Sequence, residues 1–138
     1  MMVRTWILIL FTLFAAIRPA LADWSYDEMR GVIEKGVSYD EMRELEGKFK
    51  RKIIEGEGYV LLVKPSEEIN GWDVHILDKY VEGEATKSLG DVCVVIPEGS
   101  TYSEKAKKLT AGEKVRFGGS VDHIFGKTIV IKGSAKVE

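Results

Sequence analysis

The segment from residue 54 to residue 62 reads IEGEGYVLL, and its residues alternate between two classes. One class is apolar or small and comprises Ile54, Gly56, Gly58, Val60 and Leu62; the other comprises Glu55, Glu57, Tyr59 and Leu61. A period of two places alternate residues on opposite faces of a β-strand. Glycine inside a strand often marks a sharp bend of the kind that a barrel requires. The segment therefore predicts a long, bent first strand whose Ile54 class faces a core.

The same period recurs along the rest of the chain. Further strands are predicted at residues 72–80, 91–96, 113–122 and 127–137, and a short helix interrupts them at residues 103–108. Three strands, a helix and two strands follow one another in the OB-fold, a five-stranded Greek-key barrel. We therefore expect a mainly β protein with an OB-fold barrel over residues 48–138. The side chains expected to point into this barrel are Val74, Ile76, Val115, Phe117 and Ile129.

The hexapeptide SYDEMR occurs twice before the barrel, at residues 25–30 and 38–43. In each copy a serine stands three residues before a glutamate, which is the capping-box pattern of a helix start. We predict two short helices in a hairpin over residues 23–47, the first ending at a left-handed Gly36 and the second near Gly47. Their apolar stripes are Tyr26, Met29 and Ile33, and Tyr39, Met42 and Leu45. Packing on the barrel is the favoured role of both stripes, and a partner-binding surface is the alternative.

Residues 1–22 have the features of a cleavable signal peptide. Arg4 precedes an apolar run from Trp6 to Ile17, and a small-x-small pattern ends at Ala22. The run has about 12 residues, whereas a membrane-spanning helix needs about 20. We expect cleavage after Ala22 and a periplasmic or secreted protein without a membrane span.

The charge of the mature chain limits its partners. Loss of Arg4 and Arg18 with the leader reduces the 20 basic residues to 18 against 22 acidic ones, a net charge of −4. Non-specific nucleic-acid binding depends on neutralising phosphates with Lys and Arg, so this balance disfavours it. The single cysteine, Cys93, cannot form an intramolecular disulfide, and its apolar surroundings predict a buried thiol.

The sequence offers little catalytic or metal-binding chemistry. His75 and His123 belong to neither a helix-spaced ligand pair nor a Cys-x-x-Cys site. Asp73-x-His75 and Asp122-His123 could be pieces of a metal site, although polar residues on the protein surface are the favoured interpretation. Cys93, His75 and Asp73 are the residue types of a thiol nucleophile, but no oxyanion-hole motif accompanies them. We expect no catalytic residues, no metal site and no cofactor, and hence no enzyme.

Three motifs stand out in residues 48–138: Gly58-Tyr-Val60, GEKVRFGG at residues 112–119, and Ile129-Val-Ile131 with Ala135-Lys-Val137. Through these motifs the segment resembles the tRNA-anti-like group of small bacterial OB-fold domains, many of which are exported. The resemblance implies binding of an oligonucleotide, a glycan or a protein, and it transfers no catalytic residue.

OB-folds bind ligands on the outer face of strands two and three and on the flanking loops. The candidate ligand-binding residues are Tyr59, Trp72, His75, Tyr80 and Arg116. Tyr59, His75 and Arg116 are expected to point outward, where aromatic and guanidinium groups stack on bases or sugars. Trp72 and Tyr80 lie at the ends of strand two, where closing the barrel mouth is the alternative role. We therefore consider two functions: an exported binding module of unknown ligand, or a structural adaptor of the cell envelope whose N-terminal helices hold a protein partner.

Overall fold

The computed structural model describes residues 25–36, 38–80 and 89–138, so the predicted signal peptide lies outside the described residues. The elements are α2 (Tyr26–Glu34), α3 (Tyr39–Phe49), β1 (Ile53–Pro65), β2 (Gly71–Leu77), β3 (Val92–Pro97), α4 (Ser103–Lys108), β4 (Lys114–Phe125), β5 (Thr128–Ile131) and β6 (Lys136–Val137). None of the helices in these ranges is long and apolar enough to cross a membrane.

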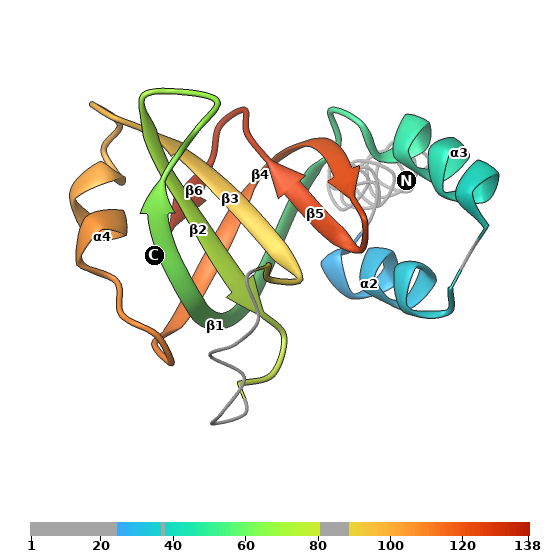
Figure 1. Ribbon diagram of the computed structural model, residues 1–138, viewed down its shortest axis with the longest axis horizontal. Coiled ribbons are helices and arrows are strands. Elements are labelled where there is room, and N and C mark those ends of the chain that lie inside the picture. The colour runs from blue at the N-terminus through green and yellow to red at the C-terminus, as the bar shows by residue number, and fades with distance from the viewer. Residues whose placement is uncertain (1–24, 37, 81–88) are drawn as a thin grey trace, which may run out of the picture.

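The predicted OB-type barrel is confirmed. Its strands are ordered β1-β2-β3-β5-β4, and a further pairing between β1 and β4 closes the sheet. β3 and β5 run parallel, whereas the other neighbouring strands are antiparallel. Figure 1 shows α4 on one side of the barrel, with α2 and α3 on the opposite side.

The predicted last strand is divided into two. β5 ends at Ile131, and β6 resumes at Lys136 to pair with β4. Between them, Ser134 has a φ of +52°, a left-handed conformation that an extended strand does not contain. The turn allows the chain to contact β4 twice, first through β5 and then through β6.

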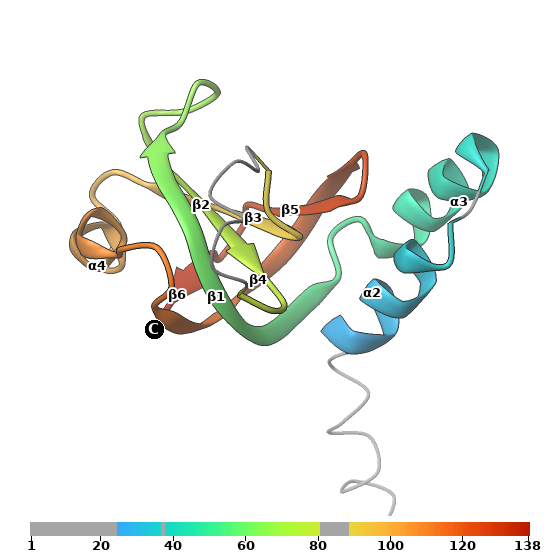
Figure 2. The ribbon, with the colours of Figure 1, turned by 60° about the horizontal axis from the view of Figure 1, so that its bottom comes forward.

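β1 bends around the barrel, as Figure 2 shows, and its glycines permit the close packing that this requires. A Cβ atom on Gly58 would lie 2.7 Å from the carbonyl oxygen of Leu77, which is too close for any other residue. A bulge between Val60 and Leu62 then shifts the register. Leu62 consequently lies opposite His75 on the outer face, so its predicted place in the core was wrong.

The barrel interior is filled by apolar side chains. The five residues predicted to point inward are at most 2% exposed, which confirms the alternation: Val74, Ile76, Val115, Phe117 and Ile129. The core also continues into α2, because the ring of Tyr26 meets that of Phe117 edge to face, with centroids 5.0 Å apart. α2 is therefore part of the barrel's core.

Both helix starts follow the prediction. The hydroxyls of Ser25 and Ser38 accept the backbone N–H of the glutamate three residues later, each at 3.2 Å. Gly36 after α2 has a φ of +72°, as the predicted left-handed end requires. α3 continues past the predicted end near Gly47 to Phe49, whose side chain is fully buried.

Candidate functional site

Three of the five predicted ligand-binding residues gather around the start of β4. Tyr59 in β1 lies opposite Lys114, the first residue of β4. Arg116 follows two residues later and so shares the outer face with Lys114. The ring of Tyr80 lies beside Gly112, two residues before the strand begins. We call Tyr59, Tyr80 and Arg116 the β1–β4 surface.

Arg116 is free to contact a ligand. Its side chain is 74% exposed, and its ion pair with Glu57 is long, at 3.7 Å. Exposed ion pairs of this kind contribute only about 0–1 kcal/mol. A ligand could therefore replace Glu57 as the partner of the guanidinium at little cost in free energy.

A shallow depression of about 250 Å³ lies beside Arg116 on the same face. It is lined by charged residues of both signs, namely Glu55, Glu57, Arg116, Lys136 and Glu138. Lys136 donates a 2.9 Å hydrogen bond to Glu55, and this bond lowers the pKa of the Glu55 carboxyl. The depression therefore offers both carboxylates and cations at neutral pH.

Trp72 lies at the other end of β2, away from the β1–β4 surface. It is half-buried, it packs against the core, and its indole N–H donates to Glu98 at 2.9 Å. The ammonium of Lys107 in α4 is 5.8 Å from the centre of its ring. These contacts match the alternative role of an aromatic that closes the barrel end.

His75 is on the outer face, but the expectation that it is exposed there was wrong. It is 3% exposed, because Leu62 and Cys93 flank it on the neighbouring strands and Gly90 donates its N–H to Nδ1 at 3.2 Å. Burial lowers the pKa of the imidazole, and nearby Lys64 lowers it further. His75 is therefore a neutral, buried side chain at pH 7.

Cys93 is buried, as predicted. It is 6% exposed and forms a small outer-face apolar cluster with Val95 and Val130. Burial raises the pKa of the thiol to about 12, so the thiolate needed for nucleophilic chemistry is scarce at neutral pH.

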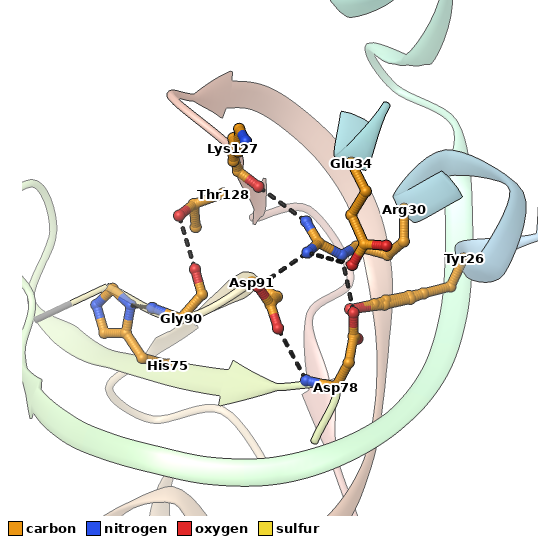
Figure 3. Close-up of polar contacts among 9 residues, drawn as sticks. All are labelled: Tyr26, Arg30, Glu34, His75, Asp78, Gly90, Asp91, Lys127 and Thr128. Atoms are coloured by element: carbon orange, nitrogen blue, oxygen red, sulfur yellow. Dashed lines mark hydrogen bonds and ion pairs between the residues drawn. The ribbon is translucent and has the colours of Figure 1, made fainter. Parts of the chain in front are cut away.

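Sequence reasoning missed a buried arginine at the contact between α2 and the barrel. Arg30 is 7% exposed, and its guanidinium donates to Asp78 at 2.9 Å, to Asp91 at 2.8 Å and to the carbonyl of Lys127 at 2.9 Å (Figure 3). Burial alone would lower the pKa of Arg30, but Asp78 and Asp91 raise it. The cation therefore ties α2 to the end of β2, the start of β3 and the turn after β4.

Two further contacts complete this network. The hydroxyl of Tyr26 donates to Asp78, and Asp91 accepts the backbone N–H of Asp78 at 2.9 Å. The first SYDEMR copy therefore supplies both polar anchors of α2, Tyr26 and Arg30. No spacing in the sequence indicates this, because Asp78 and Asp91 are 48 and 61 residues away from Arg30.

The second SYDEMR copy is placed differently. Met42 and Leu45 pack partly on the core, as predicted, but Tyr39 is 74% exposed. The guanidinium of Arg43 lies over the Tyr39 ring, 5.6 Å from its centre. The same six residues are thus a core anchor in α2 and a surface feature in α3.

The fold and these contacts define an OB-type barrel with an integrated N-terminal helix and a surface that combines half-buried Tyr59 with exposed Tyr80 and Arg116. No protein-family model matches the chain. A search of curated proteins also found no match.

Proposed function

We propose that the protein is an exported, non-catalytic OB-fold module that binds its ligand at the β1–β4 surface. The supporting observation is that Tyr59, Tyr80 and the exposed Arg116 lie around the start of β4, with a charged depression beside Arg116. The apolar filling of the barrel directs binding to the outside. Tyrosine rings and an arginine can stack on a flat base or on the apolar face of a sugar.

The ligand classes are those of the OB-fold: an oligonucleotide, a glycan or a protein. Glu55 and Glu57 lie beside Arg116, and the mature chain carries a net charge of −4 after loss of the leader. Both features oppose binding to nucleic acid through phosphate charge alone. Recognition by stacking with a few polar contacts fits this surface better.

The non-catalytic and exported parts of the proposal have separate support. Cys93 is a buried thiol with a raised pKa, which argues against a thiol nucleophile. The leader pattern of residues 1–22 supports export to the periplasm or the medium.

A second function, that of an envelope adaptor, is favoured by one observation. Tyr39 and Arg43 of the second SYDEMR copy are exposed on α3, although the first copy is built into the barrel. In the adaptor, this exposed copy would hold a protein partner. Deleting both helices cannot test the idea, because Tyr26, Met29 and Ile33 of α2 belong to the core.

Capture from an envelope extract tests the proposed binding function. Immobilised mature protein, residues 23–138, is incubated with extract that is untreated or pretreated with nuclease, with glycosidase, or with a protease that is inactivated before mixing, and a titration with the recovered ligand follows. We expect saturable 1:1 binding of one ligand class, with loss of capture in only the treatment that destroys that class. Recovery of no saturable ligand under any treatment would refute the binding module.

A further inference from the structure

Three chemically different donor groups converge on the outer face of β2 and β3. His75 in β2 lies directly opposite Cys93 in β3, and Asp73 precedes His75 by two residues on the same face. A carboxylate oxygen of Asp73, a ring nitrogen of His75 and the sulfur of Cys93 all lie within 4.8 Å of one another. Two adjacent strands thus bring one oxygen, one nitrogen and one sulfur donor together.

Two of these residues carry buried polar atoms without a hydrogen-bond partner. Nε2 of His75 and Oδ1 of Asp73 have none among the described residues, although His75 is only 3% exposed. Leaving such atoms unpaired normally destabilises the folded state. Nδ1 of His75 already accepts from Gly90, so Nε2 is the nitrogen left for the cluster. Unpaired buried ligand atoms that share one small volume are typical of a metal coordination site.

We propose that Asp73, His75 and Cys93 bind a transition-metal ion, with Zn²⁺ as the preferred ion. Imidazole and thiolate favour Zn²⁺ over the hard ions Mg²⁺ and Ca²⁺. A thiolate and a carboxylate together neutralise the two charges of the ion, which suits a buried position. Three protein ligands leave one coordination position for water or for a ligand atom. The metal site does not depend on the β1–β4 surface and is a function additional to it.

Ligation requires small adjustments within the cluster. Bond lengths of about 2.0–2.3 Å in a tetrahedral zinc site place ligand atoms about 3.5 Å apart, so the side chains, whose ligand atoms lie within 4.8 Å of one another, must close by up to about 1.3 Å. Coordination through Nε2 moves the imidazole proton to Nδ1, and the 3.2 Å hydrogen bond from Gly90 must then open. The amide of Gly90 therefore reports on the metal.

The neighbouring charges do not prevent binding. The positive charges of Lys64 and Lys132 act on Cys93, and so does the negative charge of Glu68. Lys132 is paired with both Glu68 and Asp122, which offset its charge. The ion is therefore surrounded by both positively and negatively charged side chains.

Zinc titration of the mature, tag-free protein tests the proposal. The reduced, chelator-treated protein competes with a chromophoric chelator for Zn²⁺, and Co²⁺ serves as the spectroscopic probe. We expect one ion per chain, a thiolate-to-cobalt charge-transfer band and a shifted Gly90 amide resonance. Cys93→Val and His75→Gln should each weaken binding by at least about 100-fold, since even outer-shell losses cost about 10–100-fold.

The variants include one control for correct folding and one for the specificity of the histidine. Cys93→Val removes the sulfur but keeps an apolar side chain beside Val95 and Val130, so its fold can be verified independently of metal. His123→Gln removes the other histidine, which pairs with Asp122 at 2.7 Å, and should leave zinc affinity unchanged. Zinc binding no tighter than about 1 mM, or full affinity in a folded Cys93→Val protein, would overturn the proposal.

Discussion

Replacing Phe117 with alanine should lower the free energy of unfolding by about 3–5 kcal/mol, the usual cost of truncating a large core aromatic. Phe117 is 1% exposed, and its ring supports Tyr26 of α2 edge to face. A single domain is stable by about 5–15 kcal/mol, so the loss is a large share of the total. Urea unfolding of the mature protein measures it.

The matched control is the preceding residue in β4. Arg116 points outward with a 74% exposed side chain, so Arg116→Ala should change the free energy of unfolding by no more than about 0.5 kcal/mol. The two positions are adjacent in β4 and differ in the face of the strand on which their side chains lie. Equal costs at Phe117 and Arg116 would mean that β4 has another register, and the β1–β4 surface would have to be withdrawn.

Replacing Arg30 with alanine should cost about 2–4 kcal/mol. The substitution leaves the carboxylates of Asp78 and Asp91 facing one another without the cation that joins them. Breaking a fully buried pair costs about 3–5 kcal/mol, but each aspartate side chain here is 31% exposed, and water offsets part of the loss. Urea unfolding again provides the measurement, and amide exchange in α2 should increase.

Arg43 provides the control for Arg30, because the same hexapeptide sequence precedes and includes each arginine. It occupies the equivalent position in the second SYDEMR copy, but it lies on the surface over Tyr39. Arg43→Ala should therefore cost no more than about 0.5 kcal/mol. A cost at Arg43 as large as that at Arg30 would contradict the different placement of the two copies.

The parts of the fold that depend on local periodicity could be predicted from the sequence. Alternation placed Val74, Ile76 and Phe117 in the core, and the serine–glutamate spacing located both helix starts. The bulge in β1 could not be predicted, because a bulge changes the register without changing the composition of the strand. Leu62 was consequently assigned to the wrong face.

The candidate site was only partly accessible to sequence reasoning. Alternation places a residue on a face of the sheet, but it does not reveal whether neighbouring groups cover that face, as they do at His75. The residue types of Asp73, His75 and Cys93 were recognisable. Their convergence depends on the register between β2 and β3, and the sequence does not specify it.

The β1–β4 surface can be tested most directly with two double variants that each remove one tyrosine and one arginine. Tyr59→Ala/Arg116→Ala changes this surface, whereas Tyr39→Ala/Arg43→Ala changes the exposed helix α3. After both variants are shown to fold, their affinities for the ligand recovered from the envelope extract are compared with that of the wild type. We expect a loss of about tenfold or more in the first variant, since stacking contributes about 1–3 kcal/mol per contact, and no change in the second. Full affinity in the first variant with loss in the second would contradict the binding module and favour the adaptor.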